Sequence, residues 1–228
     1  MTAHASSTND SQAVAPLLVA DGVGVEIDGA ELLAPTSLTL VEGECVAVRG
    51  QNGAGKTTLL RVLTGRLRAS AGSVRLRDEL LDERRADHRA AIAALIEPPT
   101  LYPDLTLQDQ IALIEAAWLG ARTARDAAHQ GLGSDAIELF GLQALCERFP
   151  HELSSGQRQL VSLAVTFARP AEVLILDEPE QRLDPDRRSL VAEAMLLVRE
   201  RGAAIAFATH DAALVERVAD AEMHVGGV

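Results

Sequence analysis

One short glycine-rich stretch constrains the fold of this chain more than any other feature. Residues 50–57 read Gly-Gln-Asn-Gly-Ala-Gly-Lys-Thr, the G-x-x-x-x-G-K-T pattern of a phosphate-binding loop. The apolar run 45–48 before it predicts a buried strand, and the segment 58–63 after it predicts a helix. Because strand, glycine-rich loop and helix in this order are the context in which the pattern binds phosphate, we predict an α/β fold.

The residues of this loop have separate predicted roles. Glycines let backbone N–H groups turn inward around phosphate oxygens, and the start of the following helix adds partial positive charge. Lys56 supplies a point charge to the outer phosphates, Thr57 a hydroxyl for Mg²⁺, and Thr58 a hydroxyl for an inner phosphate. The predicted phosphate-binding residues are Gly50, Gln51, Asn52, Gly53, Ala54, Gly55, Lys56, Thr57 and Thr58. The alternative is a glycine-rich turn that binds nothing.

Lys56 also stands out in the composition. It is the only lysine among 21 basic residues, and all the others are arginine. The planar guanidinium of arginine is too wide for a cradle that suits a compact ammonium group. A lysine at this one position therefore favours the phosphate-binding interpretation.

Composition limits the partners and the setting of the chain. The net charge of −12 argues against a nucleic-acid partner, which needs a basic face. The two cysteines, Cys45 and Cys146, form no disulfide or metal-binding pattern, which fits a reduced cytosolic setting. No apolar run approaches the roughly 18 residues that span a bilayer, so a role at a membrane is expected to come through a partner.

The chain is predicted to hold one domain behind a polar tail. Residues 1–16 are rich in small polar residues and predict a disordered tail, and the domain is predicted over 17–228. Helical spacing and several glycines from Thr106 to about Phe149 predict a helical insertion in pieces. We place this helical subdomain at about residues 100–160.

Two kinds of strand are expected. The loosely alternating segments 17–27 and 33–41 predict a small antiparallel sheet beside the strand that leads into the glycine-rich loop. The continuous apolar runs 173–176 and 203–208 predict strands buried on both faces of a parallel sheet. The sheet core is therefore expected to be mostly parallel.

Two acidic residues follow the apolar run 173–176. Asp177 and Glu178 are expected at the carboxyl end of a buried strand, where open α/β sheets bind their ligands. Asp177 is a candidate Mg²⁺ ligand, directly or through water. Glu178 is the candidate to polarise or orient an attacking water molecule. A polar exit from a strand, without further function, is the common alternative.

A helix start near residue 154 is a second candidate anion site. Ser154 and Gln157 have the spacing of a capping box, and helically spaced apolar residues follow them. Such a start offers free N–H groups, a serine hydroxyl and the positive end of the helix dipole to an anion. Taken alone, an ordinary capped helix is the better interpretation.

Together these stretches resemble the nucleotide-binding domain of ATP-binding cassette (ABC) proteins, from about Leu17 to the end of the chain. The matching motifs, in the order of the family, are Walker A at 50–57, the signature at 153–157, Walker B at 173–178, the D-loop at 183–184 and the switch histidine motif at 209–211. The resemblance implies a phosphate-loop NTPase core with a mostly parallel sheet, a small antiparallel β subdomain and an α-helical insertion. The implied activity is ATP hydrolysis, with ATP and Mg²⁺ as cofactors.

The resemblance also implies a head-to-tail dimer that encloses two ATP molecules. The signature residues of one subunit would face the γ-phosphate held by Lys56 of the other, and His210 would contact the same phosphate. Read alone, His210 is only a histidine at a strand exit. The signature residues expected at the nucleotide are Ser154, Ser155, Gly156 and Gln157, and the expected catalytic residues are Glu178 and His210.

Three positions depart from the pattern of the family. Ser155 stands where the signature usually has glycine, so it would crowd the phosphate or add a hydroxyl to it. Glu97 stands where a glutamine is usual, and would be a third Mg²⁺ ligand beside Thr57 and Asp177. Ile27 stands where an aromatic residue usually stacks on adenine. The base would therefore pack on an aliphatic side chain, pack on a residue of the partner subunit, or be held weakly.

The stretch around Glu97 resembles one branch of the family. Residues 96–99 and 102–106 are similar to ATPases of bacterial ABC-2-type exporters for antibiotic or lantibiotic resistance. The sequence therefore predicts an exporter ATPase that drives a separate integral membrane permease. It would lie in the cytoplasm, peripheral at the inner face of the cell membrane, beside a second ABC subunit of the same or another kind. The alternatives are a soluble ABC ATPase and a regulatory cassette that binds ATP without hydrolysing it.

Overall fold

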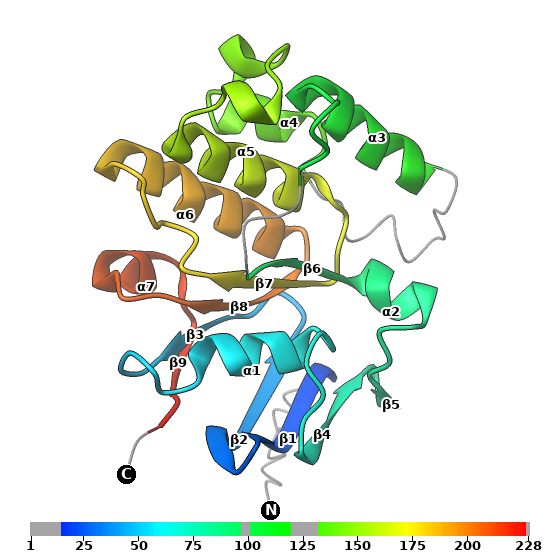
Figure 1. Cartoon of the computed structure of the whole chain (residues 1–228), viewed down its shortest axis with the longest axis vertical. Coiled ribbons are helices and arrows are strands. Elements are labelled where there is room, and N and C mark those ends of the chain that lie inside the picture. The colour runs from blue at the N-terminus through cyan, green and yellow to red at the C-terminus, as the bar shows by residue number, and fades with distance from the viewer. Residues whose placement is uncertain (1–14, 97–100, 120–131, 227–228) are drawn as a thin grey trace, which may run out of the picture.

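The computed structural model describes residues 15–96, 101–119 and 132–226. Two sheets and their helices are stacked in layers, as the α/β prediction requires (Figure 1). The first strand begins at Pro16, one residue before the predicted domain boundary. Most of the predicted tail, residues 1–14, lies outside the described residues.

The smaller sheet is antiparallel, and its strand order is β2-β1-β4-β5. Its strands are β1 (Pro16–Ile27), β2 (Ala30–Val41), β4 (Ala71–Leu76) and β5 (Glu79–Leu80). Asp28 and Gly29 join β1 to β2 with φ angles of 52° and 77°, the left-handed geometry of a tight hairpin turn. This turn pairs Ile27 with Ala30, so β2 begins three residues earlier than the apolar pattern predicts.

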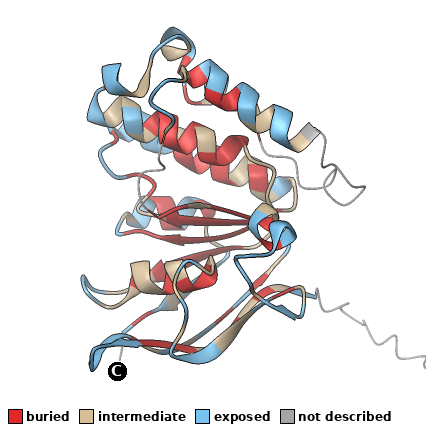
Figure 2. Cartoon of the chain, turned by 45° about the vertical axis from the view of Figure 1, so that its right-hand side comes forward, coloured by how far each residue is buried: buried red, intermediate tan, exposed pale blue. Residues whose placement is uncertain are grey.

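The larger sheet is parallel throughout, with the order β6-β7-β8-β3-β9. Its strands are β3 (Cys45–Arg49), β6 (Ile92–Leu95), β7 (Val173–Asp177), β8 (Ala204–Ala208) and β9 (Ala221–His224). All five residues of the central strand β8 are buried (Figure 2). The continuous apolar runs are therefore central parallel strands, as predicted.

Helices cover both faces of the parallel sheet (Figure 1). They are α1 (Lys56–Leu63), α2 (Ala86–Ala91), α3 (Leu107–Leu119), α4 (Asp135–Leu139), α5 (Ser155–Ala168), α6 (Pro185–Glu200) and α7 (Ala212–Val218). Two short 3-10 helices, Gln143–Leu145 and Pro150–Glu152, lie between α4 and α5. Helix α1 lies between the two sheets, while α5 and α6 lie on the opposite face and α3 and α4 lie beyond them.

Alternate residues of β7 pack in two separate hydrophobic cores. Leu174 and Leu176 pack in the cluster that includes α5 and α6, whereas Val173 and Ile175 pack in the cluster with α1 and the antiparallel sheet. This alternation is the period-2 geometry of a strand covered on both faces. The site at the end of β7 is therefore held from both sides.

The helical insertion predicted at about 100–160 contains α3, α4 and the two 3-10 helices, but α5 continues to Ala168. The predicted limit falls inside α5, because the capping box marks the start of this helix in the sequence and no such motif marks its end. Residues 120–131 of the insertion lie outside the described residues. Of the helices in the described ranges, none is both long and apolar enough to cross a membrane.

Candidate functional site

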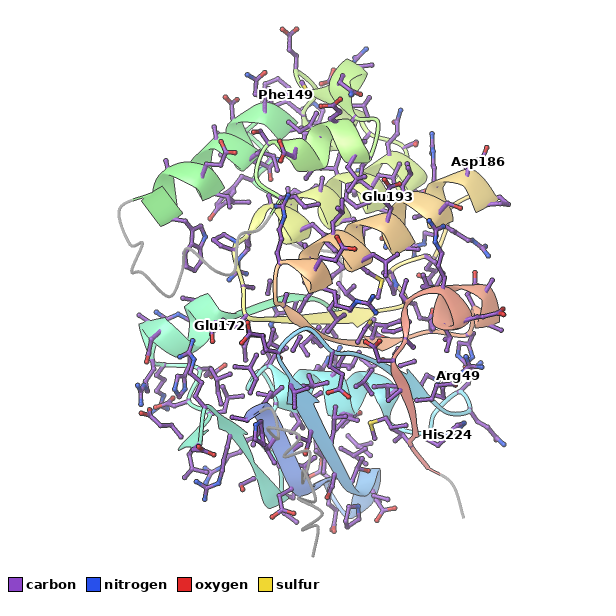
Figure 3. All side chains as sticks on the ribbon, turned by 180° about the vertical axis from the view of Figure 1, so that it is seen from behind. Arg49, Phe149, Glu172, Asp186, Glu193 and His224 are labelled. Atoms are coloured by element: carbon purple, nitrogen blue, oxygen red, sulfur yellow. The ribbon has the colours of Figure 1, made fainter. Side chains whose placement is uncertain are left out.

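The candidate site lies along the carboxyl edge of the parallel sheet. Strand β8 pairs with β3 on one side and with β7 on the other, and Ala208 is in register with both Val48 and Asp177. The loop after β3, the acids that end β7 and the turn after β8 are therefore neighbours. Arg49 at the end of β3 and Glu172 before β7 lie at opposite ends of the sheet in Figure 3.

Close packing explains two of the glycines in the phosphate loop. A Cβ atom on Gly50 would lie 2.6 Å from the carbonyl oxygen of Val225, and one on Gly55 would lie 2.6 Å from the carbonyl oxygen of Leu32. Gly55 also has a φ of 97°, which side chains rarely allow. The loop is therefore fixed between β2 and the end of the chain after β9, while Gln51, Asn52 and Gly53 at its crest are exposed.

Lys56 is buried at the mouth of this loop, with only 8% of its surface exposed. Its Nζ donates to the carbonyl oxygens of Gly50 at 2.9 Å and Gln51 at 3.0 Å. The same Nζ lies 3.3 Å from Nε2 of His210, which follows β8. The ammonium group thus brings the phosphate loop and the switch histidine motif together.

Thr57 and Asp177 form the second contact across the site. The hydroxyl of Thr57 donates to Oδ2 of Asp177 at 2.6 Å. Burial raises the pKa of Asp177, the hydrogen bond from Thr57 opposes this, and the negative charge of Glu178 adds to it. A bound cation would offset the free-energy cost of burying the negative charge of Asp177.

These two oxygen donors fit a Mg²⁺ ion. Mg²⁺ in nucleotide sites binds one or two protein oxygens and completes its shell with water and phosphate oxygens. In the described ranges, no group of three or more His, Cys, Asp or Glu side chains is arranged to hold a metal alone. Two protein oxygens are compatible with an ion that would also bind a phosphate chain. The third predicted ligand, Glu97, lies outside the described residues.

Glu178 has an unusual backbone conformation beside these groups. Its φ is 46°, in the left-handed region, and its N–H donates to the carbonyl oxygen of Ala208 at 2.8 Å. Its Oε1 lies 3.7 Å from Nε2 of His210, and its Oε2 accepts from Gln181 at 2.8 Å. Strained backbone of this kind persists where surrounding contacts impose it, and it clusters at functional sites. The structure thus brings the two expected catalytic residues together.

The predicted capping box is present at the start of α5. Oγ of Ser154 accepts from the N–H of Gln157 at 3.3 Å, and Oε1 of Gln157 accepts from the N–H of Ser154 at 2.9 Å. Ser154 and Ser155 are exposed, and Gly156 is half-buried. Among the described residues, no hydrogen bond or ion pair joins this motif to the phosphate loop of the same chain.

Ile27, the residue expected at the base, lies in the β1–β2 hairpin, whose second strand places Leu32 against the phosphate loop. Ile27 is 46% exposed at the end of β1, and Leu32, whose carbonyl oxygen lies against Gly55, is 40% exposed. Leu32 was missed because the apolar pattern placed the start of its strand at Leu33. Gln181, which donates to Glu178, was also missed, since no motif marks a turn residue that acts through a neighbour.

The comparisons identify the family. A profile described as "ABC transporter" matches residues 33–181. The chain belongs to this family. A solved structure titled "Structure of ATP binding subunit of ABC transporter" is 27% identical, covers 92% of this chain and 85% of its own, and has a TM-score of 0.79.

Curated relatives agree with the family. The Fe(3+) ions import ATP-binding protein FbpC 2 of Haemophilus influenzae is 31% identical over 86% of this chain and 55% of its own length. The spermidine/putrescine import ATP-binding protein PotA of Salmonella typhimurium is 29% identical over 89% of this chain and 53% of its own length. The chain thus spans about half the length of these relatives.

The fold and the family are as the sequence predicts, but the exporter branch finds no support in these relatives. Both are named as import proteins. The branch was inferred from residues 96–99 and 102–106, of which residues 97–99 lie outside the described residues. The motifs that carry the family likeness do not encode a direction of transport.

Proposed function

We propose that this chain is the ATP-binding and ATP-hydrolysing subunit of an ABC transporter, with ATP and Mg²⁺ as its cofactors. The observation that carries the proposal is the meeting of three groups at one sheet edge. Nζ of Lys56 lies 3.3 Å from Nε2 of His210, and Oγ1 of Thr57 lies 2.6 Å from Oδ2 of Asp177. Nε2 of His210 lies 3.7 Å from Oε1 of Glu178. A phosphate loop, a pair of oxygen ligands and a base beside a histidine are the parts that phosphoryl transfer to water needs.

Each group has a defined task in this mechanism. The N–H groups of the loop and the ammonium of Lys56 bind the phosphate chain. Thr57 and Asp177 would hold Mg²⁺, which neutralises charge on the phosphates when it is bound. Glu178 orients the attacking water and accepts its proton, and His210 donates a hydrogen bond to the γ-phosphate.

The signature residues are proposed to act on the nucleotide of a second subunit. Ser154 and Ser155 are exposed, and their own chain gives them no contact with the phosphate loop in the described ranges. The start of the 14-residue helix α5 offers free N–H groups and a positive dipole end. A head-to-tail dimer would bring Ser154, Ser155, Gly156 and Gln157 to the γ-phosphate across from Lys56.

The proposed partners are an integral membrane permease and a second ABC subunit, the same chain or another. The chain would then lie at the cytoplasmic face of the membrane. The import names of the two relatives favour import over the export predicted from the sequence. The direction of ATP-dependent flux in vesicles that contain the permease would decide between them.

Steady-state phosphate release from ATP tests the proposed activity. We expect release that requires Mg²⁺ and stops on its removal by a chelator. Glu178 argues against the alternative of a regulatory cassette that binds ATP without hydrolysing it, whereas Ser155 and Ile27 are compatible with that alternative. Tight ATP binding without any release, alone and with the permease, would support that alternative. A chain that binds no ATP would contradict both functions.

A substitution at Ile27 tests how the base is held. Because an aliphatic side chain offers only dispersion contact, we expect the wild type to discriminate weakly between ATP and GTP. Ile27→Tyr should tighten ATP binding by about 0.5–1.5 kcal/mol, the value of an aromatic pair. Titration calorimetry measures both quantities, with Leu80→Tyr on the remote strand β5 as the control. A wild type that already binds ATP far better than GTP would show that another group reads the base.

Glu97 is proposed to couple the site to the permease. It follows Ile96, the residue after β6, in a segment that leads from the sheet toward the helical insertion. A carboxylate there would attract Mg²⁺ and repel phosphate, and a residue that senses the γ-phosphate can pass the change to a partner.

We expect Glu97→Gln to leave ATP binding nearly intact but to change the stimulation of turnover by the permease. ATPase rates with and without the reconstituted permease measure this effect, together with transport. Equal stimulation and equal transport in the wild type and the variant would exclude a coupling role for Glu97.

A further inference from the structure

A buried carboxyl group lies beside the proposed catalytic residues without a role in the mechanism above. Glu180 follows Asp177 by three residues, in the turn between β7 and α6, and is only 7% exposed. Its Oε1 is hydrogen-bonded to the hydroxyl of Thr209. Its Oε2 is buried without a partner among the described residues. Because a half-satisfied buried carboxyl group costs folding free energy, a functional reason for it is expected.

The partner of Glu180 is the residue next to the switch histidine. Thr209 is 1% exposed, and its Oγ1 also accepts from the N–H of Asp211 at 2.9 Å. Asp211 in turn accepts from the N–H groups of Ala213 at 2.9 Å and Leu214 at 3.2 Å, which begin α7. The contact with Glu180 therefore fixes the chain on both sides of His210.

Backbone hydrogen bonds also hold the turn that carries Glu178 and Glu180. The N–H of Glu178 donates to Ala208, the residue before Thr209, at 2.8 Å. The carbonyl oxygen of Glu180 accepts from the N–H of Leu183 at 3.2 Å, which holds the turn after β7 in shape. The turn that carries Glu178 and the loop that carries His210 are thus joined twice, once by backbone and once by Glu180.

We propose that Glu180 is a positioning residue, whose buried carboxyl group holds Thr209 and so sets the placement of His210 relative to Glu178 and Lys56. The inference rests on the proposed function, because it assigns Glu180 a part in ATP hydrolysis. Placement matters here, since errors of about 1 Å in the geometry of reacting groups cost up to about a hundredfold in rate.

The electrostatics of the turn indicate which substitution of Glu180 should preserve activity. Burial raises the pKa of Glu180, the hydrogen bond with Thr209 opposes this, and the negative charges of Asp211 and Glu178 raise it further. A neutral group of the same shape suits this environment. Glutamine keeps both the shape and an acceptor for Thr209, whereas leucine keeps the bulk and loses the hydrogen bond.

The experiment compares Glu180→Gln, Glu180→Leu, Thr209→Val and the Glu180→Leu/Thr209→Val double variant. We expect Glu180→Leu and Thr209→Val each to lower kcat about tenfold, with the KM for ATP changed less than about twofold, as the loss of one positioning hydrogen bond implies. Glu180→Gln should keep at least about half of the wild-type kcat, and the double variant should be no slower than the single ones, because the residues act as one unit.

Glu172→Gln is the matched control, because Glu172 is also buried but lies at the opposite end of the sheet, where it pairs with Arg77 (Figure 3). It should lower the midpoint of urea unfolding and leave kcat unchanged. If Glu180→Leu does not fold, the kcat and KM values of Thr209→Val and Glu180→Gln test the role of Glu180.

Three kinds of result would overturn the role of Glu180. The first is a wild-type kcat in the variants that lack the hydrogen bond, and the second is a parallel loss of kcat and ATP affinity. The third is additive losses of kcat in the double variant. A wild type without ATPase activity would instead contradict the proposed function and this inference together. Normal wild-type turnover with unaffected variants would overturn the inference alone.

Discussion

Replacing Glu178 by glutamine is expected to abolish ATP turnover and to preserve ATP binding. The carboxylate accepts the proton of the attacking water, and an amide of the same size cannot. General-base catalysis contributes about 10²–10⁴-fold to rates, so kcat should fall by at least about a hundredfold. Phosphate release and equilibrium binding of ATP measure the two effects separately. Since hydrolysis no longer breaks the nucleotide, the variant should also accumulate as a stable ATP-bound dimer.

Glu193→Gln is a suitable control for this variant. Glu193 is exposed on helix α6, where Figure 3 labels it, and the same change of charge there should leave turnover intact. Unchanged turnover in Glu178→Gln would remove Glu178 from the catalytic role.

The Lys56→Ala variant should lose nucleotide affinity instead of only turnover. Lys56 is only 8% exposed, and its ammonium group lies at the mouth of the phosphate loop between Gly50, Gln51 and His210. Charge-assisted hydrogen bonds are worth roughly 1.5–3 kcal/mol, so ATP should bind about ten- to a hundredfold more weakly. Titration with a fluorescent ATP analogue, followed by competition with ATP, measures the change.

Arg84→Ala controls for the loss of one positive charge. Arg84 is exposed in the segment before α2, away from the carboxyl edge of the sheet, and its replacement should not change ATP affinity. Equal ATP affinity in the wild type and Lys56→Ala would place the phosphate chain outside the loop.

The central parts of the fold and site were predictable because each depends on local chemistry. A glycine-rich loop between an apolar run and a helix fixes β3 and α1, and continuous apolar runs fix β7 and β8 as buried parallel strands. Since the carboxyl ends of parallel strands share one edge, the proximity of Asp177 to Thr57 followed from the sequence order of strand and acid.

The remaining features depend on tertiary contacts that no local pattern records. The start of β2 at Ala30 is set by its pairing with Ile27 across the hairpin. The hydrogen-bond partner of Glu180 is Thr209, which lies 29 residues further along the chain. The branch of the family was predicted from residues 96–99 and 102–106 and not from the residues that form the site.

The most direct test of the account is a crystal structure of the Glu178→Gln variant with Mg²⁺ and ATP. We predict that the phosphates of ATP lie in the 50–57 loop against Lys56, with Mg²⁺ beside Thr57 and Asp177. Ser154 of a second subunit should contact the γ-phosphate of the same nucleotide. ATP bound away from the loop, or enclosed by the loop of one subunit while the 154–157 segment of every subunit lies elsewhere, would contradict the account.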